Sequence, residues 1–174
     1  MSDHKAVHSV QAKAEGKTLV MERSFEAPRE LVFKAFSGSV HLESWWGPKG
    51  WQTANSRFEF QPDGVWLYCM ECRDENQGEF YGRKSCGKAV FQEIAAPEKI
   101  VYTDMFTDEE GNVVPGMPEI LNEVYFQERD VGTKLITRSH FSSPKELQQL
   151  LDKGMVEGFS SQLERLEDYL KAIR

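Results

Sequence analysis

The sequence predicts a single α+β domain in which a long C-terminal helix packs across a curved antiparallel sheet of about six to seven strands. Between residues 51 and 141, runs rich in β-branched and aromatic residues alternate with turn signals, which is typical of short strands. Residues 143–173 instead repeat leucines and other apolar residues every three or four positions, which is typical of a helix. An apolar helical face of this length needs a broad apolar partner, and the sheet is the available one.

The strands are separated by clear turns. Gln61-Pro62-Asp63-Gly64 combines a proline that presets φ with a glycine that tolerates positive φ, and acidic or glycine-containing breaks follow at intervals. We therefore expect strands at residues 18–25, 51–60, 65–73, 79–94, 99–106, 120–129 and 133–141.

Helices are expected at three places. Pro28 suits the first turn of a short helix that ends near Phe36, and a second short helix is predicted at 40–45. The long helix begins at a capping box that starts at Ser143. Gly154 and Gly158 lie on its apolar face at a cost of about 1 kcal/mol each relative to alanine, which indicates close approach or space left open. Residues 1–17 are expected to form a flexible tail, and residues 18–174 the domain.

Composition excludes several function classes. The 174-residue chain has a formal net charge of -7 and a pI of about 5.2, which argues against nucleic acid as a partner. No apolar run is long enough for a membrane span, and the N-terminal residues lack the apolar core of a secretory signal. Three cysteines, an odd number, do not suggest a disulfide framework, so a reduced cytoplasmic protein is expected.

A metal or redox site is not predicted from the C-x-x-C of Cys69-Met70-Glu71-Cys72. Positions three apart on a strand point to opposite faces, and no second pair or nearby histidine completes a ligand set. No phosphate-binding glycine loop, Ser-His-Asp order or paired-histidine motif is present either. We therefore expect no metal and no cofactor.

Strand alternation predicts which side chains face the helix. The inward set combines large rings with a few small hydroxyls, which is the composition of small-molecule pockets. The alternative is a packed core without a void, but the two helix glycines favour a cavity. The residues expected to line it are Trp46, Trp66, Tyr68, Met70, Phe126, Thr137, Ser139, Met155 and Phe159.

Acid–base chemistry has three weak candidates in Asp104, Glu123 and Tyr68. A carboxyl buried in an apolar cleft would have a raised pKa and could act as a general acid. The alternative for each carboxylate is a solvated strand or edge residue. The segment 99–106 leaves the choice open, because Tyr102 and Asp104 share a side with Ile100 and Phe106.

Four segments carry a resemblance to a known family. Residues 25–36 are similar to the opening "f-x-A-P-x-x-x-V-W-x-A" of the START-like, or SRPBCC, superfamily, whose fold is the helix grip. Residues 45–50, Trp-Trp-Gly-Pro-Lys-Gly, resemble the "W-W-G-P-x-G" of its Hsp90 ATPase activator-homologue family. Residues 96–102 resemble the "P-E-R-I-V" segment, and residues 154–159 the "G-M-x-x-G-W" of the last helix. Phe33 and Phe159 stand where the family often has tryptophan.

The resemblance implies a cavity between sheet and helix that binds lipids, sterols, polyketides or hormones, with catalysis in a minority of members. Three hypotheses follow: a binding protein for a small hydrophobic molecule, an enzyme that uses a pocket carboxylate or Tyr68, or a module that contacts a chaperone. The family's co-chaperone role depends in part on a separate N-terminal domain, which this chain is too short to contain. The absence of a catalytic motif favours binding over catalysis. An exposed sheet edge would allow a homodimer, but nothing in the sequence requires one, so monomer and homodimer both stay open.

Overall fold

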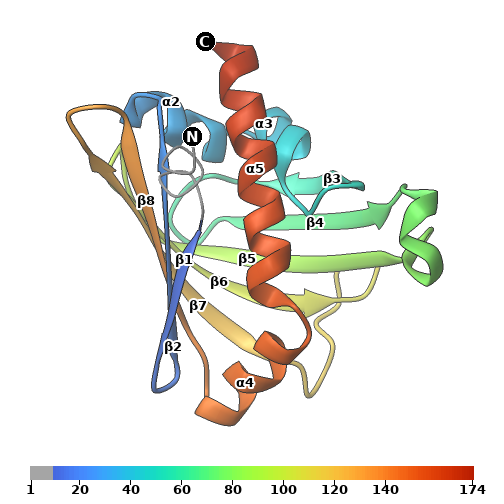
Figure 1. Ribbon diagram of the computed structural model, residues 1–174. Helices are drawn as coiled ribbons and strands as arrows, with labels where there is room; N and C mark the ends of the chain where they lie inside the picture. Colours follow the sequence, from blue (N-terminus) through green and yellow to red (C-terminus); the bar gives the residue numbers. More distant parts are fainter. Residues whose placement is uncertain (1–9) are drawn as a thin grey trace.

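The computed structural model describes residues 10–174 as one curved sheet that wraps around a C-terminal helix (Figure 1). Eight strands lie in the order β1-β2-β8-β7-β6-β5-β4-β3, every neighbouring pair is antiparallel, and the sheet is not closed. The strands are β1 (Gln11–Glu15), β2 (Thr18–Phe25), β3 (Trp51–Phe58), β4 (Val65–Cys72), β5 (Lys84–Ala95), β6 (Lys99–Thr107), β7 (Glu119–Glu128) and β8 (Thr133–His140). The predicted α+β helix-grip architecture is confirmed.

Two short helices carry the chain across to the far edge of the sheet. From β2 the chain passes through α2 (Arg29–Phe36) and α3 (Ser39–Trp45) to β3 at the opposite edge, and these helices lie at the C-terminal end of the last helix (Figure 1). The later strands then follow as hairpins until β8 pairs with β2. This path leaves the concave side of the sheet for the last helix.

Alternation along the strands separates an inner and an outer face. In β2 and β8 every second residue is buried, as expected for strands with one face on a core. Leucines of the last helix pack against large rings of α3 and β7 to form the core. The most completely buried core residues include Trp45, Phe126, Leu135, Leu163, Leu166 and Leu170. This packing holds the helix against one half of the sheet.

The C-terminal helical segment is divided in two, where the sequence predicted one helix. Helix α4 (Pro144–Asp152) is capped by the Ser143 hydroxyl, which accepts from the backbone N–H of Glu146, as the capping box predicted. Gly154 then adopts a left-handed conformation with φ of 89°, and the 19-residue α5 (Met155–Ile173) starts on a new axis. Gly154 therefore serves the break between the helices, and only Gly158 faces the sheet side.

Two further boundaries differ from the expectation. Part of the expected 1–17 tail is strand β1, which pairs with β2 through the turn at Gly16 and Lys17; the rest of that expectation, residues 1–9, lies outside the described residues. Strand β5 begins at Lys84 instead of residue 79, because the preceding Glu75–Phe80 forms a 3-10 helix. That helix starts where the Asp74 carboxylate accepts from the Asn76 backbone N–H.

The cysteines also differ from the expectation of three reduced thiols. Cys69 of β4 and Cys86 of β5 are register partners and form a disulfide, while Cys72 is a buried free thiol. Sequence spacing alone could not reveal this pair, because the register of β4 on β5 decides which residues meet. Within residues 10–174, none of the helices has the length and apolar character needed to cross a membrane.

Candidate ligand-binding cleft

A cleft of about 270 Å³ lies between the concave face of the sheet and the first turns of α5. An engineered apolar cavity of about 150 Å³ holds a benzene molecule, so this volume suits a compact ring system or a short chain. Three other hollows in the described residues are each lined by at least four charged residues. The cleft is lined by Met21, Trp46, Pro48, Tyr68, Met70, Tyr102, Asp104, Phe106, Ile120, Asn122, Thr137, Ser139, Met155, Gly158, Phe159 and Gln162.

The most polar point of the cleft is the contact between Tyr68 of β4 and Asp104 of β6. The phenol donates to both carboxylate oxygens, at 2.9 and 3.1 Å. These two strands are not neighbours, since β5 lies between them. Gly87 is the register partner of Tyr68 on β5, and a Cβ atom built on it would lie 2.3 Å from the Tyr68 Oη. The missing side chain at Gly87 therefore lets the tyrosine ring lie across β5 and reach Asp104.

Burial changes the acidity of this pair. It raises the pKa of Asp104 to about 7, against the opposing effects of the Tyr68 hydrogen bond and a hydrogen bond from the Met105 backbone. Part of the Asp104 surface stays accessible, because it faces the cleft. Burial, followed by the nearby Asp104 charge, raises the pKa of the Tyr68 phenol well above its ordinary range. A carboxyl that titrates near neutrality can exchange a proton at physiological pH.

A second polar point is formed by Asn122 of β7 and Ser139 of β8. These register partners are both buried, and the Ser139 hydroxyl donates to the Asn122 Oδ1 at 2.6 Å. The Asn122 amide nitrogen has a weak contact, 3.5 Å from the carbonyl oxygen of Ile120. Ile120 is the register partner of Asp104, so Asn122 is diagonal to Asp104 at roughly 7–8 Å between Cα atoms. The amide can therefore contact a second polar group of one small ligand.

The loop that contributes Trp46 and Pro48 is held by polar groups of α5. The Arg165 Nη1 donates to the carbonyl oxygens of Trp46, Gly47, Pro48 and Trp51 at 2.8–3.3 Å. The Gln162 side-chain oxygen accepts from the Gly47 backbone N–H at 2.8 Å. Side chains of α5 thus hold the loop, one wall of the cleft, by hydrogen bonds to the loop's backbone and not to its side chains.

The structure brings seven of the nine predicted lining residues to the cleft: Trp46, Tyr68, Met70, Thr137, Ser139, Met155 and Phe159. Trp66 does not line it, since its indole packs against Trp46 and Phe91 and donates to Asn55 at 2.8 Å. Phe126 does not line it either, because it is buried in edge contact with Phe33 and Phe36. Both rings face inward as predicted, but they lie nearer α2 and α3, where those helices fill the space.

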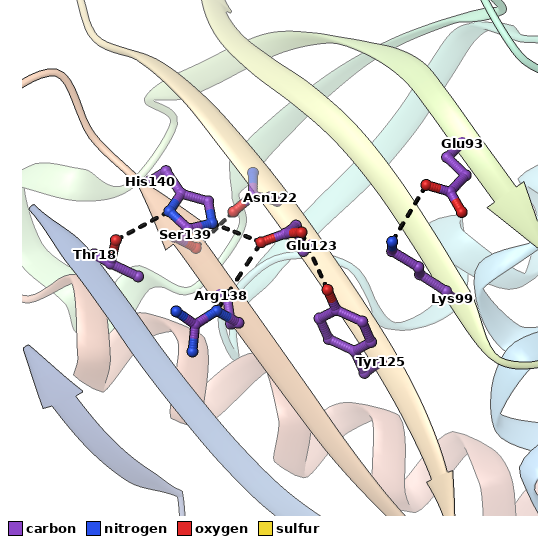
Figure 2. A network of polar contacts seen from close by, with 9 residues as sticks. All are labelled: Thr18, Glu93, Lys99, Asn122, Glu123, Tyr125, Arg138, Ser139 and His140. Carbon is purple, nitrogen blue, oxygen red and sulfur yellow. Dashed lines mark hydrogen bonds and ion pairs between the residues drawn. The ribbon is translucent and has the colours of Figure 1, made fainter. Parts of the chain in front are cut away.

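Glu123, the other carboxylate candidate, lies on the outer face of the sheet (Figure 2). Its carboxylate contacts His140 Nε2 at 2.6 Å and accepts from the Tyr125 hydroxyl at 3.1 Å, with Arg138 at 4.0 Å. The hydrogen bond with His140, helped by Tyr125, lowers the pKa of Glu123 against a partial burial that raises it. Asp104 and Glu123 therefore cannot act together on one ligand in the cleft.

Sequence reasoning does not identify seven further lining residues or the positioning residue Gly87: the seven are Met21, Pro48, Tyr102, Phe106, Ile120, Asn122 and Gln162. Tyr102 shares a side with Asp104, so resolving the face of its strand would have found it. Asn122 is in phase with Val124 and Phe126, which gave a usable signal for an inward amide. The sequence gives no signal for Gly87, because its role beside Tyr68 depends on the register between β4 and β5.

Comparison with known proteins agrees with this architecture. The family model "Activator of Hsp90 ATPase homolog 1-like protein" matches residues 26–171. A solution structure of a protein from Arthrobacter aurescens is 27% identical, with a TM-score of 0.83 over 95% of this chain and 92% of that one. The crystal structure of protein Ms6760 from Mycobacterium smegmatis is 26% identical, with a TM-score of 0.80 over 93% of this chain and 95% of that one. No curated protein gives a significant match.

Proposed function

Because the chain belongs to the Activator of Hsp90 ATPase homolog 1-like family, within the START-like superfamily, we propose that it binds a small, mainly apolar molecule in the cleft between the sheet and α5. The cleft itself carries this proposal. Its volume of about 270 Å³ is lined mostly by rings and aliphatic side chains, with two separated polar points. This combination of apolar walls and sparse, placed polar groups is typical of ligand sites.

The first experiment is a search for ligands. We would measure thermal stability and native mass spectra of the full chain against a library of compact hydrophobic metabolites. A ligand that binds the folded state raises the melting temperature by mass action. The proposal expects at least one compound to bind at one molecule per chain.

A variant that fills the cleft assigns such binding to this site. The substitution Gly158→Leu places a side chain beside Pro48, whose Cγ lies 4.0 Å from a Cβ built on Gly158. It also removes a helix-interior glycine, so the fold should not lose stability. Asp168→Leu, at an exposed position of the same helix, is the matched control. Ligand binding that survives Gly158→Leu would place the site elsewhere.

A second candidate function is acid–base catalysis on the bound molecule. The observation in its favour is the hydrogen bond between Tyr68 and Asp104 together with the near-neutral pKa of Asp104. Its test is incubation of an identified ligand with wild type and Asp104→Asn, with products followed by mass spectrometry. Conversion by wild type and loss of conversion with retained binding in the variant would support an enzyme.

A chaperone partner is a third candidate, supported by the family's description alone. It predicts that the chain changes the ATPase rate of a purified chaperone of the Hsp90 class. An unchanged rate with saturating protein would contradict this candidate and leave the two that act through the cleft, ligand binding and catalysis on the bound molecule.

A further inference from the structure

Among residues 10–174, the cleft lining has an acidic side chain but no basic one. Of the lining residues in the described part of the chain, Asp104 is the one that ionises near neutral pH. The remaining titratable members are the phenols of Tyr68 and Tyr102, and burial raises the pKa of both. No lysine, arginine or histidine from β2, β7, β8 or α5 is among these lining residues. An ionised Asp104 therefore has no counter-ion within the cleft.

Arg23 of β2 is a buried cation, but it pairs with Glu167 at 3.3 Å and is not among the lining residues. The half-buried Arg165 does not supply a counter-ion either. Arg165 of α5 directs its Nη1 to the carbonyl oxygens of Trp46, Gly47 and Trp51, at 2.8–3.0 Å. Those contacts turn the guanidinium toward the loop backbone, and Arg165 is not among the residues that line the cleft. A ligand with a carboxylate would therefore meet a negative group without any compensating cation.

Asp104 also has unused acceptor capacity. An ionised carboxylate offers about four acceptor positions. Here both oxygens share one phenol O–H, and the Met105 backbone supplies one further hydrogen bond. The side that faces the cleft is left for a donor on the ligand.

The surrounding rings suit a positive donor. Tyr68 contacts the carboxylate, and Tyr102 lies two positions before Asp104 on the same face of β6. The Trp46 ring centroid is 6.0 Å from that of Tyr68. Aromatic faces attract an ammonium group within about 6 Å of the centroid, most strongly where water is excluded. Carboxylate and rings thus favour the same ligand group.

We infer that the cleft selects a compact apolar amine, whose protonated nitrogen binds the Asp104 carboxylate among the rings of Tyr68, Tyr102 and Trp46. The inference rests on the proposed function of the cleft and narrows it to a ligand class. The ammonium supplies the missing counter-ion, and the apolar remainder packs against Met70, Met155 and Phe159. Neutral isosteres bind less tightly, and carboxylic acids least.

The test uses three probes with one ring system: 2-(2-naphthyl)ethylamine, 2-(2-naphthyl)ethanol and 2-naphthylacetic acid. Their affinities for the full chain are measured by isothermal titration calorimetry at pH 8 and physiological ionic strength. We expect wild type to bind the amine at least about tenfold more tightly than the alcohol, since charge-assisted hydrogen bonds are roughly twice as strong as neutral ones. The acid should bind weakest.

Two variants assign the preference to Asp104. Asp104→Asn should bind the alcohol as wild type does and lose the preference for the amine. Asp168→Asn removes the same charge from an exposed position of α5 and should keep the preference, which controls for the overall charge of -7. An amine preference that persists in Asp104→Asn would overturn the inference, as would its absence in wild type.

A pH series in wild type keeps the test independent of any folding defect in Asp104→Asn. The naphthylethylamine stays protonated throughout, whereas Asp104 gains a proton as the pH falls below about 7. The preference for amine over alcohol should therefore shrink from pH 8 to pH 5.5, and a constant ratio would contradict the inference. If the alcohol binds, and Gly158→Leu abolishes its binding, but the amine has no advantage, then only the amine selectivity fails. If none of the three probes binds, the amine inference fails, and the proposed function fails with it only when the library of hydrophobic metabolites also yields no ligand.

Discussion

Tyr68 and Asp104 contact one another across an intervening strand, and the glycine at position 87 makes the contact possible. Cross-strand pairs normally involve adjacent strands. Here β5 contributes no side chain at the crossing point, so a residue of β4 reaches β6 directly. Both residues therefore line the cleft, where burial raises the pKa of each.

The first prediction concerns the pH dependence of stability. Asp104 has a pKa of about 7 in the folded chain and an ordinary value near 3.8 when unfolded. Between these values the folded state holds more protons than the unfolded state, so the free energy of unfolding falls as the pH rises. Relative to Asp104→Asn, wild type should lose roughly 1–3 kcal/mol between pH 4 and pH 8, a range that allows for screening by water in the cleft.

Urea unfolding of both proteins at several pH values measures this difference. The change should level off above about pH 7, because the folded chain has then lost the Asp104 proton as well. Asp168→Asn should follow wild type at every pH. A difference between wild type and Asp104→Asn that does not change with pH would show that the carboxyl titrates normally.

A second prediction concerns Gly87. The substitution Gly87→Ala places a methyl group 2.3 Å from the Tyr68 hydroxyl oxygen, so the ring must move. Overpacking of this kind costs typically about 1–3 kcal/mol, and the hydrogen bond to Asp104 is lost with it. Urea unfolding gives the cost, and carboxyl ¹³C NMR should report a changed Asp104 titration.

Two controls separate this effect from the general cost of altering a glycine. Gly158→Ala meets only Pro48 at 4.0 Å and should be neutral or stabilising. Tyr68→Phe removes the hydroxyl without a clash and should change the Asp104 titration with a smaller loss of stability. Identical Asp104 titrations in wild type and Gly87→Ala would refute the positioning role of Gly87.

The fold could be predicted from the sequence because its signals are local. The turn at Gln61–Gly64 and the capping box at Ser143 each act within a few residues, so they identify elements without tertiary information. The 3-10 helix before β5 is not predicted, because Phe80 at its end and Tyr81 directly after it resemble the start of a strand. The break at Gly154 is not predicted either, since a single glycine inside an apolar repeat fits a helix end as well as close approach or open space on a helix face.

The site could be predicted only in part, because alternation identifies a face and not a position along it. Trp66 and Phe126 face inward as predicted, but α2 and α3 cover that end of the sheet. Periodicity does not decide which face of the sheet Asp104 lies on, since its strand carries apolar residues on both faces. Glu123 illustrates the other limit, because its partner His140 comes from a neighbouring strand whose register was unknown.

A third prediction follows from the pairing of Cys69 with Cys86. Unfolded, unreduced protein should contain one reactive thiol, which belongs to Cys72, and three after reduction. Thiol alkylation followed by peptide mass spectrometry under non-reducing conditions checks both the number and the pairing. Three reactive thiols before reduction in protein purified without reductant would contradict the disulfide and support the expectation of a reduced chain.

The last prediction concerns Arg165, whose guanidinium has backbone carbonyls as its hydrogen-bond acceptors. Its Nη1 lies 2.8 Å from the Gly47 oxygen and 3.0 Å from those of Trp46 and Trp51. Arg165→Met keeps the apolar stem but leaves these acceptors without their donor, so we expect a loss of about 2–4 kcal/mol in the free energy of unfolding. Arg165→Lys should lose less than Arg165→Met, since an ammonium can still donate to some of the carbonyls.

The same change should alter the cleft, because the released loop carries Trp46 and Pro48. Near-UV circular dichroism should report a loosened tryptophan environment, and the affinity for any cleft ligand should fall. Arg57→Met is the matched control, since that exposed arginine pairs with Glu59 on the surface and should cost no more than about 0.5 kcal/mol. Equal stabilities for the two variants would show that α5 does not hold the loop through Arg165. The wall of the cleft would then depend on Gln162 and side-chain packing instead.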